Sequence, residues 1–397
     1  MNIRDIALRR IIDSRGNPTI EAEIRTKTGF GRAAAPAGAS TGTHEAVAWP
    51  EGSVAKGMKV AEEKILPQLI GLSSENQENF DKTLRDIDGT SNFSNVGGNV
   101  TVALSLACAK AAADSKEINL YEHVGKAENY ELPAPMANVL GGGAHAIGGT
   151  DIQEYLVTSF SNDVNSAIEA NADVHKKVGS LLKEKFPNVA LGKGDEGAWV
   201  APLGNVEALE LVVDAANEVE KETGIEIRPG LDMAASEFYK DGKYRYKEQN
   251  LTPEKQVDFV AGLIEEYDLH SVEDPLDQED FESWASLTDQ TDALIIGDDL
   301  YVTNTERLQK GIETGATNSI LIKPNQIGTL TDTISAVELA NKADMANVIS
   351  HRSGETTDAT IAHLGVAFGS HAIKTGIMGG ERIAKLNELV RISEQLR

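Results

Sequence analysis

The sequence predicts an α/β protein in which a small α+β domain precedes a larger barrel of strands and helices. Two observations support this fold class. The residues before position 132 combine short alternating strands with an Ala-rich helix, whereas those after it repeat a short apolar run followed by an amphipathic helix. A chain of 397 residues also has room for about two domains. We place the boundary in the Pro-rich segment at 132–135, which gives domains at residues 1–132 and 133–397.

The first domain is expected to begin with two strands, Ile3–Leu8 and Thr19–Thr26. In the second strand aliphatic and charged side chains alternate, which is typical of a strand with one buried face. The Ser-Arg-Gly-Asn-Pro segment between the strands has the composition of a turn. The pattern is helical over 54–124, apart from a loop near residues 88–99, and includes an Ala-rich helix at Val100–Asp114. This mixture predicts an α+β domain.

In the second domain, each of six apolar runs is followed by an ionisable residue and then by a helical pattern. These residues are Asp232, Glu273, Asp298, Lys323, His351 and Lys374. From Glu273 onward they are 23 to 28 residues apart, enough for a crossover helix to the next parallel strand. The helix expected at Pro253–Asp268, with Thr252 as its N-cap, illustrates the alternate element. In a closed parallel barrel the carboxyl ends of the strands meet at one mouth, so we expect all six residues around one cavity.

Three of these residues, Asp232, Glu273 and Asp298, are carboxylates, which are hard oxygen ligands. Crowding them together without a cation would raise their pKa values, so a divalent metal ion is the natural occupant. Oxygen ligands without cysteine or paired histidine nearby favour Mg²⁺ over Zn²⁺. The alternative is that each carboxylate caps the helix that follows it. That arrangement is common for one Asp after a strand and rare for three together.

Lys323 and Lys374 follow strands whose neighbours end in the carboxylates. Nearby cations disfavour the ammonium form, so either lysine could act as a base, and salt bridges to the carboxylates are an equal alternative. Segment 350–355 (Ser-His-Arg-Ser-Gly-Glu) offers an Arg fork and hydroxyl groups, which suit an anion such as phosphate.

Three further features have weaker signals. Glu196 lies on a Gly-flanked turn at 194–197 and could be a general acid, although an ordinary β-turn explains the same residues. The small-residue loop at 36–42 could move and close over a site, or could be a simple connection. His145, in a Gly-rich segment, could equally be a surface residue.

Nine short motifs occur in the order in which the enolase family has them, and through them the sequence resembles that family nearly from end to end. Each motif alone is weakly specific, whereas nine in order are highly specific. They are Ser14–Thr19, Gly38–Gly42, Gln153–Glu154, Gly194–Gly197, Gly230–Asp232, Val272–Pro275, Gly297–Leu300, Ile322–Gly328 and Ser350–Glu355. Two segments, Ala48–Glu51 and Ile377–Gly380, depart from the residues that the family usually has there.

The resemblance implies a C-terminal (β/α)8-type enolase barrel with a smaller N-terminal cap domain. It implies a Mg²⁺-dependent lyase that reversibly dehydrates 2-phosphoglycerate to phosphoenolpyruvate in glycolysis and gluconeogenesis. Lys323 would be the catalytic base and Glu196 the general acid. The implied metal ligands are Asp232, Glu273 and Asp298 for one Mg²⁺ and Ser40 for a second that arrives with substrate. The implied substrate contacts are His145, Gln153, Glu154, Ser350, His351, Arg352, Ser353 and Lys374.

Two rival functions remain open at this point. One is another superfamily enzyme that dehydrates or racemises acids and sugars, which would share the metal ligands but lack the phosphate-binding segment and the Ser40 loop. The other is a non-catalytic paralogue that serves as a binding or structural protein. Retention of the base, the acid and all metal ligands argues against it.

The composition excludes several classes of protein. The 62 Asp and Glu residues outnumber the 37 Lys and Arg residues, a formal net charge of −25 that argues against a nucleic-acid partner. A single cysteine, Cys108, excludes an internal disulfide. The sequence lacks an apolar run of about 18 residues and an apolar signal-peptide region, so we expect no membrane span and a cytoplasmic location. The resemblance further implies a homodimer with an ion pair between Glu21, expected on the outer strand of the first domain, and Arg391, on the last helix of the other subunit.

Overall fold

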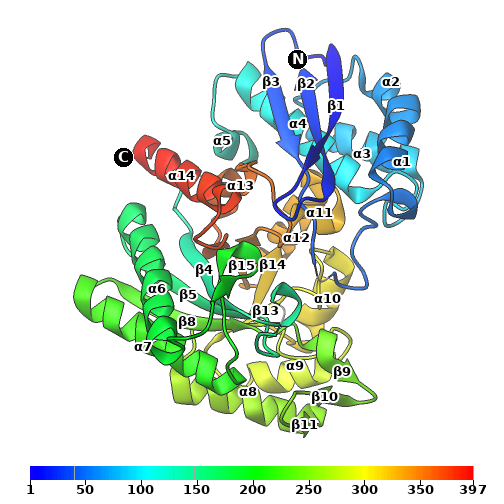
Figure 1. Cartoon of the computed structure of the whole chain (residues 1–397). Coiled ribbons are helices and arrows are strands. Elements are labelled where there is room, and N and C mark those ends of the chain that lie inside the picture. The colour runs from blue at the N-terminus through cyan, green and yellow to red at the C-terminus, as the bar shows by residue number, and fades with distance from the viewer. Residues whose placement is uncertain (40, 128, 147, 397) are drawn as a thin grey trace.

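The computed structural model describes residues 1–397 except 40, 128, 147 and 397. It contains a smaller domain, drawn at the top of Figure 1, and a larger barrel domain below it. We propose the boundary at 132/133, in the connection between the last helix of the small domain, α5 (Leu120–Val124), and the first barrel strand, β4 (Ala134–Gly141).

The small domain is built on an antiparallel sheet of three strands. Its order is β1 (Asp5–Ile12), β2 (Pro18–Arg25) and β3 (Phe30–Ala34), so β2 is the middle strand. The Ala-rich helix is α4 (Gly98–Ser115), and it lies directly on this sheet. The approach is close enough that a Cβ atom on Gly31 would stand 2.0 Å from the carbonyl oxygen of Ala107. Glycine and alanine at this contact are therefore required by the packing.

The other helices of the small domain flank α4. They are α1 (Val54–Val60), α2 (Leu66–Leu69), α3 (Gln77–Asp88) and α5. The loop expected near 88–99 separates α3 from α4, and Gly89, with φ of 71°, ends α3 in the left-handed conformation. The helical region predicted from the sequence is therefore confirmed.

Eight strands form the closed barrel of the second domain. In chain order they are β4, β5 (Glu154–Phe160), β8 (Glu226–Asp232), β12 (Ser271–Glu273), β13 (Leu294–Gly297), β14 (Ser319–Ile322), β15 (Ala346–Ser350) and β16 (Ala372–Lys374). Each strand pairs with the next, and β16 pairs with β4 to close the sheet. The fold class predicted from the sequence is confirmed.

One strand departs from the uniform parallel arrangement that we expected. β5 runs antiparallel to both of its neighbours, β4 and β8. In its described residues, the connection from β4 to β5 has a short 3-10 turn, Gly143–His145, and no crossover helix, so the chain returns in the opposite direction. As a result the beginning of β5 lies at the rim where the other strands end, and Glu154 is in register with Asp232.

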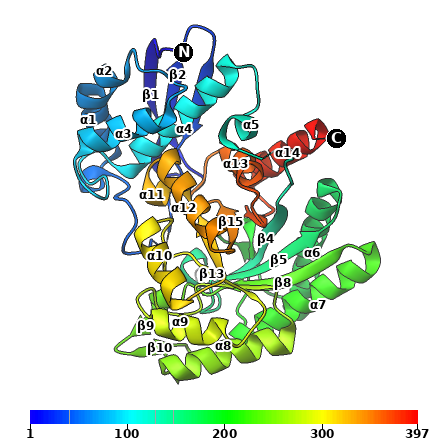
Figure 2. The ribbon, with the colours of Figure 1, turned by 180° about the vertical axis from the view of Figure 1, so that it is seen from behind.

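Helices surround the barrel, as the two opposite views in Figures 1 and 2 show. They are α6 (Val164–Lys185), α7 (Asn205–Thr223), α8 (Pro253–Tyr267), α9 (Phe281–Thr288), α10 (Thr305–Thr314), α11 (Pro324–Ile327), α12 (Leu330–Lys342), α13 (Thr360–Phe368) and α14 (Gly380–Gln395). The helix predicted from Pro253 is α8, and it begins at that residue. Within the described part of the chain, none of the helices has a stretch hydrophobic enough and long enough to span a bilayer.

The inside of the barrel is filled by a separate apolar cluster of fully buried side chains. Its members are Met136, Leu156, Ile296, Leu321, Val348 and Ala372. Four of them stand two residues before Asp298, Lys323, Ser350 and Lys374 respectively. Because side chains two apart on a strand point to the same side, these polar residues also face the barrel axis. The buried apolar cluster therefore lies one layer below the polar residues at the rim.

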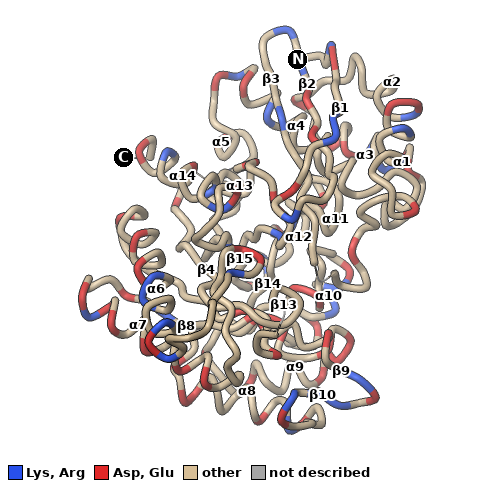
Figure 3. The backbone as a smooth tube through the Cα atoms, in the orientation of Figure 1, with Lys and Arg blue, Asp and Glu red and all other residues tan. Residues whose placement is uncertain are grey.

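Charged residues are distributed over both domains, with acidic and basic positions interspersed along the backbone (Figure 3). Some of them join the two domains. Thr331 of α12 donates its backbone N–H to the Asp81 carboxylate of α3 (2.9 Å), and Lys110 of α4 lies 3.0 Å from the Asp358 carboxylate. The small domain is thus docked against the side of the barrel that includes segment 351–358.

Candidate active site

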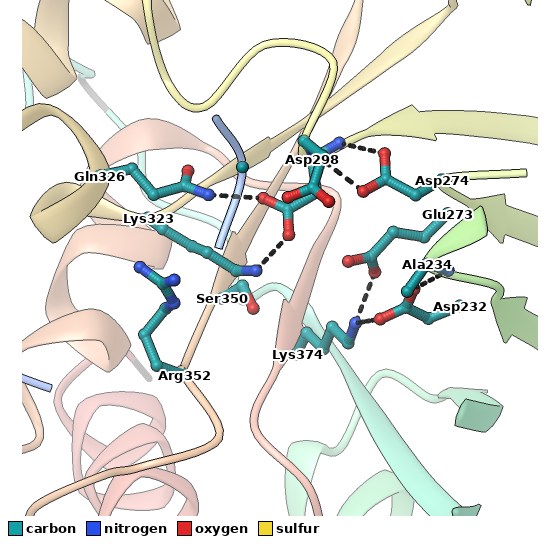
Figure 4. A network of polar contacts seen from close by, with 12 residues as sticks. Asp232, Ala234, Glu273, Asp274, Asp298, Lys323, Gln326, Ser350, Arg352 and Lys374 are labelled. Carbon is teal, nitrogen blue, oxygen red and sulfur yellow. Dashed lines mark hydrogen bonds and ion pairs between the residues drawn. The ribbon is translucent and has the colours of Figure 1, made fainter. Parts of the chain in front are cut away.

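One pocket at the carboxyl ends of the barrel strands contains nearly all of the predicted site residues. Gly38, His145, Gln153, Glu154, Glu196, Asp232, Ala234, Asp274, Asp298, Asp299, Lys323, Ser350, His351, Arg352, Ser353 and Lys374 line it. Glu273 does not line the pocket but bonds to Lys374, which does. Ser40 lies outside the described residues. Figure 4 shows the part of this site around the two lysines.

Lys374, the last residue of β16, is the centre of the first polar cluster. Its Nζ donates to Asp232 Oδ2 (2.9 Å) and Glu273 Oε2 (2.5 Å), and lies 3.1 Å from Glu154 Oε2. Burial opposes the ammonium form, but the three carboxylates outweigh burial and raise the pKa of Lys374. One ammonium group thus contacts three buried carboxylates, from β5, β8 and β12, and offsets only part of their negative charge.

Lys323, which follows β14, is the centre of the second cluster. Its Nζ forms an ion pair with Asp298 Oδ2, while Gln326 donates to Asp298 Oδ1 (2.8 Å). The Asp274 carboxylate accepts the backbone N–H groups of Asp298 and Asp299, at 2.9 Å each, and so fixes the turn after β13. Burial lowers the pKa of Lys323, but the Asp298 charge outweighs this effect, and the net shift is upward.

Acidic groups that can bind a cation are present on both sides of the pocket. In the described residues, ligand atoms of two groups lie within 4.8 Å of one another: His145, Glu154 and Glu196 in one, Asp274, Asp298 and Asp299 in the other. The predicted ligands Asp232, Glu273 and Asp298 do not form such a compact group here: Lys374 bridges Asp232 and Glu273, and Lys323 pairs with Asp298.

The predicted ligand set nevertheless fits a divalent cation. Glu273 Oε1 is buried and has no hydrogen-bond partner, which is costly for a carboxylate oxygen unless a ligand uses it. Burial and the Asp232 charge raise the pKa of Glu273. The negative charge of the carboxylates gathered here therefore exceeds the positive charge of the lysine beside them. Oxygen donors of this kind are those that Mg²⁺ prefers.

Glu196 lies on a tight turn, Asp195–Gly197, between the short strands β6 (Gly192–Lys193) and β7 (Trp199–Val200). Its φ of 65° is in the left-handed region, and its side chain is buried. Asn138 of β4 donates to Oε2 (3.2 Å), and His351 Nε2 lies 3.2 Å from Oε1. An ordinary exposed β-turn does not hold a carboxylate in this way.

The two histidines near Glu196 differ in charge. Burial and the Arg382 charge lower the pKa of His351 to about 4 against the opposing effect of Glu196. For His145, burial is outweighed by Glu154, 3.1 Å from Nδ1, and by Glu196, so its pKa rises to about 9. Burial raises the pKa of Glu196, but the contact with His351 and the positive charges of His145 and Arg382 outweigh burial and hold it below the usual range. At neutral pH the site therefore contains a neutral His351 and a charged His145.

The anion-binding segment is held on its outer side by the small domain. Arg352 donates to the Glu45 carboxylate through Nη2 (2.9 Å to Oε1) and Nη1 (3.0 Å to Oε2), and to Asn325 Oδ1 (2.9 Å). Ser353 Oγ accepts the backbone N–H of Ala39 (2.6 Å). Ala39 and Glu45, which precede and follow position 40 in the chain, thus contact the predicted phosphate-binding segment directly.

Sequence reasoning missed several residues of the site. Asp274 and Asp299 directly follow residues that it selected, but nothing in the pattern distinguishes a turn-fixing carboxylate from its neighbour. Gln326 lies within the Ile322–Gly328 motif, but its hydrogen bond to Asp298 was not predicted. Glu45 and Arg382 gave no signal at all, because both reach the site from elsewhere in the fold.

Comparisons with known proteins agree with this geometry. Two family models match the chain: "Enolase, N-terminal domain" over residues 3–124 and "Enolase, C-terminal TIM barrel domain" over residues 129–397. The chain is 52% identical to the enolase of Halorubrum lacusprofundi over 400 residues (99% of this chain, 98% of the relative). It is 50% identical to that of Methanosphaera stadtmanae over 402 residues (99% and 97%), and 45% identical to that of Thermoplasma acidophilum over 396 residues (99% and 98%). The chain therefore belongs to the enolase family, the phosphopyruvate hydratases of glycolysis, which are lyases.

Proposed function

We propose that this chain reversibly dehydrates 2-phosphoglycerate to phosphoenolpyruvate, with Lys323 as catalytic base and Glu196 as general acid. The observation that carries these roles is their placement: both line the same pocket but come from separated elements. Lys323 follows β14, whereas Glu196 lies in the turn beside β7, which pairs with β4, and β15 and β16 stand between β14 and β4. A substrate in the pocket can therefore lose a proton on one side and a hydroxyl group on the other.

We further propose Asp232, Glu273 and Asp298 as ligands of one Mg²⁺ and Ser40 as a contact of a second that arrives with substrate. The unpartnered Glu273 Oε1 supports the first assignment. As in enolase-superfamily sites generally, the ions would stabilise the negative charge that develops on the substrate carboxylate.

Lys323 must lose a proton before it can accept one, and its ion pair with Asp298 opposes that loss. Asp298 cannot serve Lys323 and a cation equally, so its use as a metal ligand removes the partner that raises the pKa of Lys323. Glu196 must likewise gain a proton, and the negative charge of a bound phosphate and carboxylate favours its neutral form. Both protonation states are thus expected only in the loaded site.

We propose that the remaining pocket residues bind substrate. Arg352 and Ser353 suit the phosphate, because a guanidinium fork matches a tetrahedral anion. Glu45 now occupies that fork, so it must yield to the phosphate or share the guanidinium with it. The other proposed contacts are His145, Gln153, Glu154, Ser350, His351 and Lys374.

One assay tests the function directly. Purified protein is expected to form phosphoenolpyruvate, followed by its ultraviolet absorbance, from 2-phosphoglycerate with Mg²⁺ and not with a chelator. A non-catalytic paralogue would give no product under either condition. A superfamily enzyme of different specificity would leave 2-phosphoglycerate unchanged and act on an acid or sugar without phosphate.

The small-residue loop at 36–42, with the residues that follow it, is expected to be protected when substrate binds. Thr41, Thr43 and His44 are exposed, while Ala39 and Glu45 contact the anion-binding segment. Limited proteolysis with mass spectrometry should find cleavage in this loop in the free protein and much less with substrate and Mg²⁺ together. Equal cleavage in both states would mean that the loop is a simple connection. Cleavage at an unrelated surface loop provides the control.

We propose a cytoplasmic homodimer that has no nucleic-acid partner. The expected ion pair of Glu21 with Arg391 of the other subunit needs one correction: Glu21 lies on the middle strand β2, not on an outer strand. Within the chain Arg9 donates to Glu21 (2.5 Å), and Arg391 donates to Glu388 (2.6 Å), so an intersubunit pair must compete with both contacts.

The wild type is therefore expected to sediment as a dimer at micromolar concentration, and Arg391→Glu to weaken the dimer without unfolding it. Exposed ion pairs contribute only about 0–1 kcal/mol, so the change in dissociation constant should be small. Arg245→Glu is a matched charge reversal that should leave association unchanged: Arg245 ends β10 (Lys243–Arg245), in a separate three-stranded antiparallel sheet of the barrel domain at the lower right of Figure 1. A wild type that sediments as a monomer would contradict the proposal.

A further inference from the structure

A buried arginine outside the predicted site contacts the site from behind. Arg382 lies in the first turn of α14, and its side chain is 0% exposed. Its Nη1 donates to His351 Nδ1 (2.8 Å) and to the carbonyl of Arg352 (2.5 Å), and its Nη2 donates to the carbonyl of Ser353 (2.6 Å). It thus binds three consecutive residues of the segment that lines the pocket.

The contact with His351 decides which imidazole nitrogen has the hydrogen. A guanidinium group has only donors and keeps its proton throughout the physiological range, so Nδ1 of His351 must accept. The ring then has its hydrogen on Nε2, which lies 3.2 Å from Glu196 Oε1 in a close polar contact that is not aligned as a hydrogen bond. The low pKa of His351, about 4, is consistent with this neutral ring.

The opposite tautomer would present the wrong group to Glu196. With the hydrogen on Nδ1, the lone pair of Nε2 would face the carboxyl group and compete for its proton. The other oxygen of Glu196 is held by Asn138 and cannot turn away without losing that bond. A general acid next to such a ring would give its proton to His351 rather than to the departing hydroxyl group.

We propose that Arg382 is a positioning residue for the general acid: it fixes His351 with the hydrogen on Nε2, and His351 then orients the Glu196 carboxyl group. This inference rests on the role proposed above for Glu196. Arg382 does not line the pocket, so the effect on Glu196 that we propose passes through His351, while its bonds to the carbonyls of Arg352 and Ser353 hold the same segment in place.

The tautomer can be measured without any activity. In protein labelled with ¹⁵N-histidine, two-dimensional NMR distinguishes a protonated from an unprotonated ring nitrogen, and the His351 signals are identified by their absence in His351→Gln. We expect the wild type to have Nδ1 unprotonated and Nε2 protonated. A proton on Nδ1 of His351 in the folded wild type would overturn the proposal. This result is independent of whether the protein converts 2-phosphoglycerate, which the product assay tests separately.

Kinetics then test whether Arg382 acts through His351. Arg382→Met is expected to slow dehydration by about 10- to 100-fold, the scale of a misplaced catalytic group. Exchange of the substrate C2 proton with deuterated water should continue, since Lys323 is untouched. In a His351→Gln background the same substitution should have little further effect. Equal slowing in both backgrounds would show an independent structural role and refute the proposal.

Lys385 provides a matched control. It lies on the same helix, is 1% exposed, and donates to the carbonyls of Thr356 (3.0 Å) and Asp358 (2.8 Å) without contacting His351. Lys385→Met removes a comparable buried cation, so it should lower thermal stability yet leave the His351 tautomer unchanged. If Arg382→Met does not fold, Arg382→Lys keeps a buried charged donor, and it should retain the wild-type tautomer and most of the dehydration rate. A Lys385→Met protein with an altered tautomer would contradict the assignment.

Discussion

Lys323→Ala is expected to abolish both phosphoenolpyruvate formation and exchange of the substrate C2 proton, whereas Glu196→Gln should slow only the first. Lys323 is the group proposed to take the proton, so without it neither process can begin. Glu196→Gln leaves Lys323 in place but cannot supply a proton to the departing hydroxyl group. General-acid assistance contributes about 10²- to 10⁴-fold, and turnover should fall by at least that factor.

Proton NMR in deuterated water, with Mg²⁺ and 2-phosphoglycerate, measures both processes in one sample. If Glu196 only shapes its turn, Glu196→Gln should slow phosphoenolpyruvate formation and C2-proton exchange to the same extent, because substrate affinity or folding is then lost. If Lys323→Ala exchanges C2 normally and Glu196→Gln does not, the two roles are assigned the wrong way round. Circular dichroism of each variant excludes misfolding as the cause.

Glu273→Ala should raise the Mg²⁺ concentration needed for half-maximal activity by about 100-fold or more and remove most activity at low Mg²⁺. The substitution deletes a proposed ligand and leaves Lys374 with two carboxylates in place of three. Titration calorimetry with Mg²⁺ alone measures the loss without turnover. Glu282→Ala, an exposed acid at the start of α9, is the matched control and should bind Mg²⁺ as the wild type does. Wild-type activity of Glu273→Ala at micromolar Mg²⁺ would reject the assignment.

The strand ends were predictable because their signal is local. An apolar run that ends in a charged residue identifies both a buried strand and its rim, and the spacing between runs fixes the crossovers. Asp232, Glu273, Lys323 and Lys374 lie where this reasoning puts them, at or directly after strand ends. Helix α8 was equally predictable, because Thr252 and Pro253 mark its beginning.

The direction of β5 was not predictable in the same way. A run of buried residues looks the same whether its strand is parallel or antiparallel, and only the absence of a crossover helix after β4 decides it. The contact of Glu45 with Arg352 joins residues 307 positions apart, and only the docking of two domains creates it. Protonation states also depend on such distant neighbours, so the low pKa of His351 could not be foreseen from segment 350–355.

The pairing of β16 with β4 has a consequence for the way the protein is made. During synthesis, the strands that end in Asp232 and Glu273 leave the ribosome long before Lys374, whose ammonium group pairs with both carboxylates. Until almost the whole chain has emerged, the nascent barrel is therefore open beside β4. Its rim also has unpaired carboxylates during this time. The small domain has no such delay, because β1, β2 and β3 pair in sequence order. Ribosome-bound chains that end before residue 372 should accordingly contain a protease-resistant small domain and an unfolded barrel.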